Sequence, residues 1–358
     1  MNSVRPIRSI AARGSLGFEH SEGETALPPG IELPPFRPTP LLRGGSAQTI
    51  VAPFWPQMPD ARPSSSHRIA LSDGDRLVVM EYRPEGWRNG CRIALMVHGL
   101  NGCYRSRYMA RIGRELTRRG LLVVRVNMRG CGPGFGLARG LNHAGRSEDA
   151  RAVLQWLAGR YPASPVTQIG FSLGGNATLK MAGEDGANPT GRLDTVVAVS
   201  PPVDLTASSG HLRRPGNRFY DWYFARESMR AALRLQRRFP DMPPVRFPRR
   251  MTLFAFDDRF TAPRSGFRNA LDYYTRASAA PVIPRIAVPT LILCARDDPV
   301  VECETLRKLG GRPGLDIVLT RQGGHMAFIG ADGRPFGFRW MDALVLAWME
   351  RIIRAGTS

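Results

Sequence analysis

"GFSLGG", residues 170–175, joins two segments of different kind. The run before it, "VTQI", has the residue types of a strand, and "NATLKMAG" after it has the spacing of a helix. A glycine-rich link between a strand and a helix has three interpretations: a phosphate cradle, a tight turn without chemistry, or the mount of a nucleophile. The rest of the chain decides between them.

Ser172 occupies the centre of a G-x-S-x-G pattern whose flanking glycines are Gly170 and Gly174. In this pattern the serine stands on a sharp turn between strand and helix, and its hydroxyl projects clear of the backbone. Both glycines are expected to face crowded backbone, where a side chain would clash. The pattern favours a nucleophile, and a structural turn is the alternative until partners for the serine are found.

Length and composition indicate a globular protein with a substantial core. The chain has 358 residues, of which 43% are hydrophobic and 22% charged. No run approaches the roughly 18 apolar residues of a membrane-spanning helix, and the amino terminus lacks the apolar segment of a secretory signal. Five scattered cysteines without a C-x-x-C pair argue against disulfides and zinc, so we expect reduced thiols, a cytoplasmic location, no metal and no cofactor.

The formal net charge of +20 comes almost entirely from arginine, because lysine occurs only at Lys180 and Lys308. We interpret this skew as a coding bias toward arginine. A nucleic-acid-binding protein would gather its basic residues on one face, whereas arginines occur throughout this chain. We therefore expect no nucleic-acid partner.

Short apolar runs alternate with helical patterns from about residue 67 onward. Strands are predicted at 76–83, 91–97, 121–128, 166–171, 193–200, 288–295 and 315–320, and helices at 106–120, 147–161, 173–183 and 339–356. This alternation predicts the α/β fold class, with a mostly parallel central sheet and helices on both of its faces.

Two regions depart from this alternation and define the predicted domain organisation. Residues 1–45 are rich in Pro, Gly and Arg and lack periodicity, so we interpret them as an N-terminal arm. Residues 46–358 form the α/β domain. Within it, residues 206–285 are rich in arginine and aromatic residues and show no clear buried strand, which predicts a cap inserted between two strands, over the carboxyl edge of the sheet.

A serine hydroxyl becomes a good nucleophile only when a base takes its proton, so a histidine and an orienting acid are needed. In a fold with a strand–serine–helix turn, their order along the chain is serine, acid, histidine. His325 follows the strand predicted at 315–320, and Asp297 and Asp298 follow the strand before it. We favour Asp298 as the acid because it directly precedes a proline turn, and Asp297 is the rival.

The oxyanion of an acyl-transfer intermediate needs backbone N–H donors aimed at it. One expected donor is the N–H of Leu173, directly after the serine. The second is assigned to Leu100, in the loop "HGLNG" after the strand predicted at 91–97. His98 in this loop precedes the serine in the chain, so we interpret it as a bracing residue rather than the base.

Six stretches, in order, carry a family resemblance: "MVHGLNG", "VNMRGCG", "GFSLGGN", "FDDRFTAPRSGFRNALDYY", "VPTLILCARDDPVV" and "GGHMAF". The chain resembles the YheT-like branch of the α/β-hydrolases over about residues 36–350. The resemblance implies an α/β-hydrolase fold, a serine-esterase mechanism with Ser172, Asp298 and His325, and a cap over the site. Members of this branch include bacterial esterases and eukaryotic relatives that act on monoacylglycerols or phospholipids.

We predict a serine hydrolase that cleaves carboxylic esters, of short- to medium-chain acyl or monoacylglycerol type, through an acyl-enzyme. The expected partner is a small amphiphilic ester. Two alternatives stay open: an acyltransferase using the same triad, and a non-catalytic binding protein with this fold. A nucleotide site is not expected, because "GFGLARG" (134–140) does not begin a helix and no P-loop pattern occurs.

The segment 211–250 is the densest basic region of the chain. Arg226, Arg230 and Arg234 recur every fourth residue, which places them on one face of a predicted helix. Five aromatic residues lie just upstream: Phe219, Tyr220, Trp222, Tyr223 and Phe224. We interpret the segment as a solvated face of the cap, and the alternative is peripheral contact with an anionic membrane surface.

Overall fold

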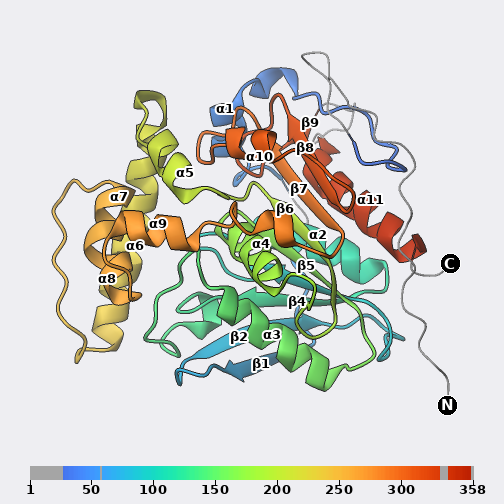
Figure 1. Ribbon diagram of the computed structural model, residues 1–358, viewed down its shortest axis with the longest axis horizontal. Helices are drawn as coiled ribbons and strands as arrows, with labels where there is room; N and C mark the ends of the chain where they lie inside the picture. The colour runs from blue at the N-terminus through green and yellow to red at the C-terminus, as the bar shows by residue number, and fades with distance from the viewer. Residues whose placement is uncertain (1–26, 57–58, 331–337, 356–358) are drawn as a thin grey trace.

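The computed structural model describes residues 27–56, 59–330 and 338–355, which fold around one eight-stranded sheet (Figure 1). The strand order is β1-β2-β4-β3-β5-β6-β7-β8. The strands are β1 (Ser65–Ala70), β2 (Arg76–Tyr82), β3 (Ile93–Val97), β4 (Leu122–Asn127), β5 (Val166–Phe171), β6 (Leu193–Val199), β7 (Thr290–Ala295) and β8 (Leu315–Thr320).

The sheet is parallel from β4 to β8, and β1 and β2 join one edge in antiparallel fashion. The predicted α/β class and mostly parallel sheet are therefore confirmed. Strand β1 was not among the predicted strands. Its sequence, "SSHRIA", is mostly polar and half exposed because it lies at the edge of the sheet, so it lacks the apolar run of the central strands.

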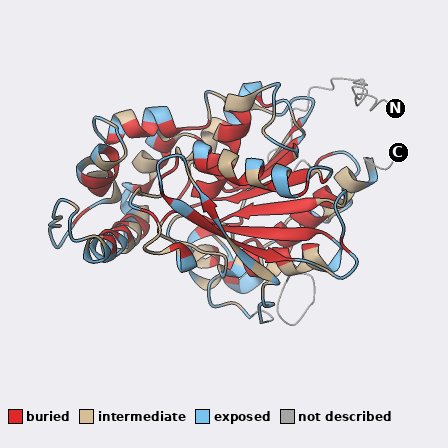
Figure 2. Ribbon diagram, turned by 90° about the horizontal axis from the view of Figure 1, so that it is seen from below, coloured by how far each residue is buried: buried red, intermediate tan, exposed pale blue. Residues whose placement is uncertain are grey.

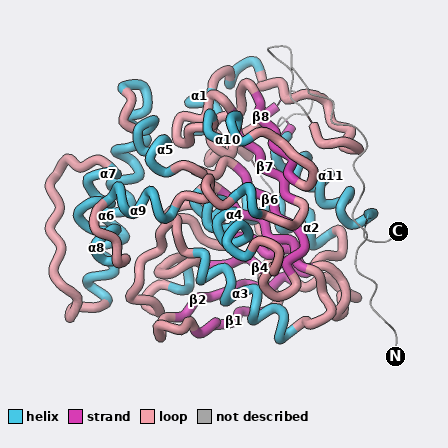
Figure 3. The backbone as a smooth tube through the Cα atoms, viewed as in Figure 1, coloured by secondary structure: helices cyan, strands magenta, loops and turns pink. Residues whose placement is uncertain are grey.

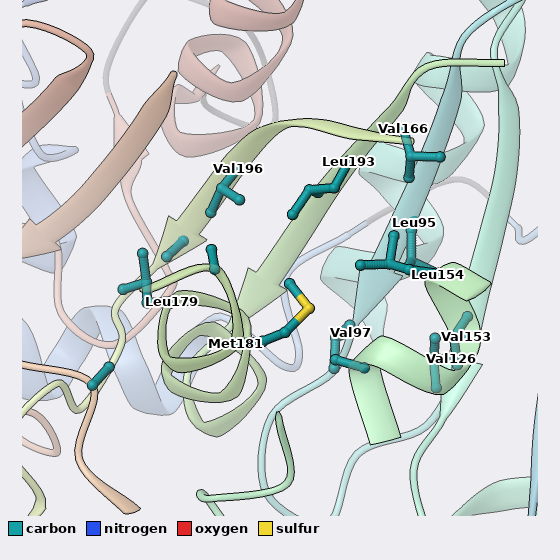
Figure 4. Close-up of a cluster of buried hydrophobic side chains, with 14 of the residues drawn as sticks. Leu95, Val97, Val126, Val153, Leu154, Val166, Leu179, Met181, Leu193 and Val196 are labelled. Carbon is teal, nitrogen blue, oxygen red and sulfur yellow. The ribbon is translucent and has the colours of Figure 1, made fainter. Parts of the chain in front are cut away.

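Helices cover both faces of the sheet, as predicted. On one face lie α3 (Ser147–Arg160), α4 (Leu173–Asp185) and α10 (Glu304–Leu309), and on the other lie α2 (Arg107–Arg118) and α11 (Trp340–Ala355). The α3–α4 face meets the strands through aliphatic side chains of both layers, among them Leu95, Val126, Leu154 and Met181 (Figure 4). Figure 2 shows the buried strands in the centre and the exposed outer faces of the helices.

Helix α11 packs on the sheet through one apolar face. Met341, Leu344, Val345 and Trp348 lie in the core, where α11 contacts α2, and Ile352 packs at the edge of the same cluster. Among the residues described, no helix combines the length and the apolarity that crossing a bilayer requires.

Between β6 and β7 the chain is entirely helix and loop, and it projects to one side of the sheet (Figure 3). We call this segment the candidate cap. It contains α5 (Leu205–Leu212), η3 (Pro215–Asn217), α6 (Arg218–Arg238), α7 (Leu253–Phe256), the π-helical turn η4 (Asp257–Thr261), α8 (Ala262–Arg264), α9 (Ala270–Ala277) and η5 (Ile283–Arg285). These elements occupy the stretch predicted as a cap.

The described part of the N-terminal segment lies against the carboxyl-terminal helix. The indole N–H of Trp340 donates to the Pro34 carbonyl at 2.8 Å, and Arg351 donates to the Pro29 carbonyl at 3.0 Å. The segment continues through η1 (Pro40–Leu42) into α1 (Gly45–Val51). A short pair of strands, β9 (Ile329–Gly330) and β10 (Phe338–Arg339), lies beside it, and η2 (Gly132–Gly134) follows β4.

Candidate active site

Ser172 stands alone between the end of β5 and the start of α4, as the sequence pattern predicts. Its backbone has φ +51° and ψ −122°, a region that L-residues with side chains rarely adopt and that turns the chain sharply. The flanking glycines permit this turn. A Cβ at Gly170 would stand 2.5 Å from the Gly174 carbonyl, and one at Gly174 would stand 2.7 Å from the Val97 carbonyl.

The fold brings Ser172, His325 and Asp298 into one chain of hydrogen bonds. The Ser172 Oγ lies 3.0 Å from His325 Nε2, and His325 Nδ1 lies 2.9 Å from Asp298 Oδ2. Their exposed fractions are 9%, 8% and 1%, so solvent competes little for these bonds. With Nδ1–H donating to the carboxylate, Nε2 is left to accept from the serine hydroxyl.

Asp298 is held from three sides. Its Oδ1 accepts from the N–H groups of Val300 and Val301 at 2.8 and 3.0 Å. His211 of α5 contacts the Asp298 carbonyl through Nε2 at 2.9 Å. These contacts fix the direction in which the Asp298 carboxyl group points.

Asp297, the rival acid, has a different set of partners. Its Oδ1 accepts from the Gly324 N–H at 2.9 Å, and its Oδ2 is buried without a hydrogen-bond partner among the described residues. Burial raises the pKa of this carboxyl. Asp297 thus contacts the backbone of the loop that carries His325, and the imidazole itself contacts Asp298.

Both expected oxyanion donors lie where the sequence places them. Leu173 opens α4 directly after the serine, and Leu100 lies in the loop after β3. Within the described ranges, neither backbone N–H meets an acceptor. The β3 loop is close to the serine, since a Cβ on Gly99 would stand 3.0 Å from Ser172 Cβ, and Tyr108 braces it by accepting from the Gly99 N–H at 3.0 Å.

His98 is fully buried below this loop. Its Nε2 accepts from the Met128 N–H at 3.1 Å, so Nδ1 carries the proton and donates to the Gly99 carbonyl at 2.7 Å. Burial lowers the pKa of His98 to about 4, which keeps the ring neutral. The ring ties the loop after β3 to the loop after β4.

Helix α1 contacts the His325 loop, which sequence reasoning missed. Thr49 Oγ1 accepts from the His325 N–H at 2.8 Å and donates to the Gly45 carbonyl at 2.6 Å. The buried Gln48 side chain donates to the Ile329 carbonyl at 3.0 Å and accepts from the Ile329 N–H at 2.8 Å. These residues lie some 280 positions from their partners, so no local pattern could reveal the contact.

A cavity of about 190 Å³ extends from Ser172 under the candidate cap. Its apolar wall comes from cap residues and from the chain after Asp298, including Leu205, Leu212, Phe224, Leu253, Phe256, Phe260, Val300 and Val301. The loop containing "GFGLARG" supplies Phe135, Gly140, Leu141 and His143. The sequence argues against a nucleotide site in this loop and predicts no other role for it. Its glycines are the sequence feature that singles the loop out.

In the described part of the chain, no three His, Cys, Asp or Glu side chains gather as a metal site would require. Arg129 lines the cavity and is paired with carboxylates behind the wall. Asp149 and Asp75 pair with Arg129 at 2.7 Å each, which fixes the loop after β4. The cavity therefore joins the hydrogen-bonded Ser172, His325 and Asp298 to a mainly apolar chamber.

A family model described as "alpha/beta hydrolase fold" matches residues 95–332. The chain belongs to the α/β-hydrolase family. This α/β-hydrolase is 30% identical over 313 residues to "Putative esterase YheT" of Escherichia coli (strain K12), an alignment covering 86% of this chain and 88% of the relative. It is therefore a YheT-like member of the family, which confirms the resemblance seen in the sequence.

Two further proteins are similar to this α/β-hydrolase, one in sequence and one in structure. It is 28% identical over 244 residues to "Monoacylglycerol lipase" of Saccharomyces cerevisiae (strain ATCC 204508 / S288c), covering 65% of this chain and 54% of that protein. The structure of "2,6-dihydroxy-pseudo-oxynicotine Hydrolase" aligns with a TM-score of 0.56 at 19% identity, covering 87% of this chain and 72% of the other. The structural similarity supports the fold alone.

Proposed function

We propose that this protein hydrolyses carboxylic esters through an acyl-enzyme, with Ser172 as nucleophile, His325 as base and Asp298 as orienting acid. The observation that carries the proposal is the buried hydrogen-bond chain from Ser172 through His325 to Asp298 at the end of an apolar cavity. The names of the relatives, an esterase and a monoacylglycerol lipase, support the same class of reaction.

In the first half-reaction, Ser172 Oγ attacks the ester carbonyl while His325 Nε2 takes its proton. The negative charge on the carbonyl oxygen is stabilised by the N–H groups of Leu100 and Leu173. Asp298 stabilises the imidazolium that forms. The tetrahedral intermediate then collapses, His325 returns the proton to the leaving alkoxide, and the alcohol departs from the acyl-serine.

In the second half-reaction, water attacks the acyl-serine and His325 takes a proton from it. The acid is released and the Ser172 hydroxyl is restored. An alcohol entering in place of water would complete an acyl transfer by the same steps. Product analysis in water with and without added alcohol separates the two outcomes.

The cavity supports an amphiphilic ester as substrate. An apolar wall favours burial of an acyl chain, at about 0.8 kcal/mol per CH₂ group. A chamber of about 190 Å³ suits short to medium chains better than long ones. We therefore propose medium-chain esters and monoacylglycerols as the substrate class.

The experiment that tests the reaction is labelling with a fluorophosphonate together with turnover of p-nitrophenyl esters. Ser172→Ala should abolish both, and persisting activity would remove Ser172 from its role. Ser200→Ala is the matched control, because Ser200 is also a buried serine with positive φ directly after a strand, but does not line the cavity. It should keep labelling and turnover.

We also propose that α6 contacts an anionic membrane surface. Phe219, Trp222 and Tyr223 are 55%, 43% and 46% exposed on this helix, and their rings contact one another. Exposed arginines flank them, including Arg218, Arg226 and Arg230. Aromatic and basic residues side by side fit the boundary of anionic lipid head groups.

Co-sedimentation with vesicles tests this contact. Wild-type protein should bind vesicles containing phosphatidylserine more than vesicles of phosphatidylcholine alone, and Trp222→Ser combined with Phe219→Ser should weaken the binding. Equal binding to both vesicle types would remove the proposal. Leu271→Ser, another exposed apolar residue in the candidate cap, is the control.

A further inference from the structure

Asp257 is a carboxyl group in the roof of the cavity. It lies in the π-helical turn η4, it is 9% exposed, and it lines the same cavity as Ser172. Its Oδ2 accepts from the Tyr274 hydroxyl at 2.8 Å, and the Thr261 hydroxyl also hydrogen-bonds to it. Within the residues described, no Arg, Lys or His forms an ion pair with it.

Burying a carboxyl group in these surroundings has a free-energy cost. Phe256 and Phe260 flank it in a buried apolar cluster, and the charge of Asp221 also raises its pKa. Burial raises the pKa of Asp257 to about 6. An apolar residue would cost less here, and a buried, perturbed carboxyl that lines a cleft is a candidate for ligand contact.

The local backbone provides a second, independent indication. Asp257 opens a π-helical turn between α7 and α8, and such turns are rare and often occur at functional sites. Asp257 and Thr261, which begin and end this turn, both line the cavity, as does Tyr274 of α9. The turn and α9 thus bring one carboxyl and two hydroxyl groups together in the roof, which also carries Ser208, Ser209, Ser228 and Arg234.

This polar group shares its surroundings with the nucleophile. Tyr274 packs in one buried cluster with Leu205 and Leu173, and Leu173 directly follows Ser172. A ligand in the cavity can therefore meet Ser172 and the Asp257 group at once. The Asp257 carboxyl group can accept a hydrogen bond from a donor on the ligand. The net charge of +20 disfavours an ammonium ion as this donor relative to a neutral hydroxyl.

We propose that Asp257, held by Tyr274 and Thr261, forms a subsite that binds a free hydroxyl group of the ester substrate. The subsite makes hydroxyl-bearing esters better substrates than esters of equal chain length without a hydroxyl. This inference rests on the proposed ester hydrolysis and names the substrate class that the same site selects. The hydroxyl can belong to the alcohol part or to the acyl part of the ester, and the experiment below distinguishes the two.

Paired substrates test the subsite. For the alcohol part, kcat/KM for 1-lauroylglycerol is divided by kcat/KM for ethyl laurate. For the acyl part, kcat/KM for ethyl 12-hydroxydodecanoate is divided by kcat/KM for ethyl laurate. For wild type, the ratio of kcat/KM values should exceed one in at least one pair. Asp257→Leu removes the acceptor and keeps a side chain of similar volume, so it should lower that ratio by about tenfold. The pair that changes identifies the part of the substrate that is bound.

Asp204→Asn is the matched control, because Asp204 is another carboxyl of the candidate cap but does not line the cavity. It caps the start of α5 by accepting from the Ala207 N–H at 2.9 Å, and an amide oxygen can still accept there, so its ratios should equal those of wild type. Asp257→Asn keeps an acceptor and should fall between wild type and Asp257→Leu. It also serves as the test variant if Asp257→Leu does not fold.

Two results overturn the inference and leave ester hydrolysis intact: wild-type ratios near one in both pairs, or ratios that do not change in the Asp257 variants. Failure of wild type to hydrolyse any of these esters overturns the proposed function and this inference with it. The two kinds of failure are thus distinguished by whether wild type turns over at least one of the three esters.

Discussion

The site has two halves that are built differently. The sheet-edge half carries Ser172, His325 and Asp298, and backbone hydrogen bonds and close glycine contacts hold each of them. The candidate-cap half consists of helices α5–α9, whose side of the cavity is mainly apolar, with Asp257 as its buried carboxyl. The sheet-edge half holds the reacting atoms in position, and the candidate-cap half encloses the cavity.

The difference follows from what each half must do. Acyl transfer requires the reacting groups within a few tenths of an ångström, so their positions depend on backbone contacts that cannot relax. Binding an acyl chain requires apolar surface of suitable size, which many side chains can supply. Substitutions in the sheet-edge half should therefore have large effects on rate or stability, and those in the candidate cap should mainly change substrate choice.

The largest effect is expected at the acid. Asp298→Asn should lower kcat by about 10³- to 10⁴-fold, because an amide cannot hold the imidazole in the correct tautomer. Asp297→Asn should cost less than tenfold, since an amide oxygen can still accept from the Gly324 N–H. Steady-state kinetics of the two variants compare them, and the reverse order of effects would assign the role of acid to Asp297.

Two glycine substitutions, one in each half, should change the free energy of unfolding in opposite directions. Gly174→Ala should lower the free energy of unfolding by about 3 kcal/mol, because its Cβ would collide with the Val97 and His98 carbonyls. Gly210→Ala, in cap helix α5, should raise stability by about 0.5 to 1 kcal/mol, because no atom lies within 4 Å of its Cβ. Urea unfolding measures both, and equal effects would contradict the contrast.

Acid sensitivity should come from two buried neutral histidines, His98 in the sheet-edge half and His143 facing the candidate cap. Burial lowers their pKa values to about 4 and about 3. As the pH falls below about 6.5, the unfolded chain binds protons that the folded chain does not, so stability decreases. His98 alone should account for about 3 kcal/mol between pH 7 and pH 4.

Unfolding free energies measured from pH 7 to pH 5 in wild type, His98→Asn and His143→Phe test this dependence. Each variant should show a weaker decrease with pH than wild type. A slope that neither substitution alters would place the acid-sensitive groups elsewhere.

A smaller effect on rate than that of Asp298→Asn is expected at α1. Thr49→Val removes the acceptor of the His325 N–H and should lower kcat and the rate of fluorophosphonate labelling by about tenfold, with little change in KM. Thr49→Ser keeps the hydroxyl and should restore both rates. If valine and serine act alike, α1 contributes only packing.

Much of the sheet-edge half could be predicted from the sequence because its signals are local. The turn at Ser172 needs glycines at fixed positions. Asp298 and His325 lie within about five residues of the ends of predicted strands, and the carboxyl ends of these strands meet at one edge of a parallel sheet. Strand β1 was missed because an edge strand needs no apolar run, and α1 because its partners are remote in sequence.

The candidate cap was predicted only as an insertion. Its helices bury side chains against one another and against the loop after β4, and no single-sequence periodicity states which side chains face a cavity. Asp257 appeared in the sequence only as part of a family-like stretch, and its burial beside Tyr274 depends on the π-helical turn.

The sequence by itself determined the α/β class, the alternation of strands and helices, and the order in which serine, acid and histidine follow their strands. These features depend on periodicity and on turn chemistry within a few residues. The tertiary structure alone decided that α1 holds the His325 loop, that Asp298 rather than Asp297 contacts the imidazole, and that a carboxyl lies in the apolar roof. Such contacts join residues far apart in the chain, and only the packing of the whole domain fixes the distances between them.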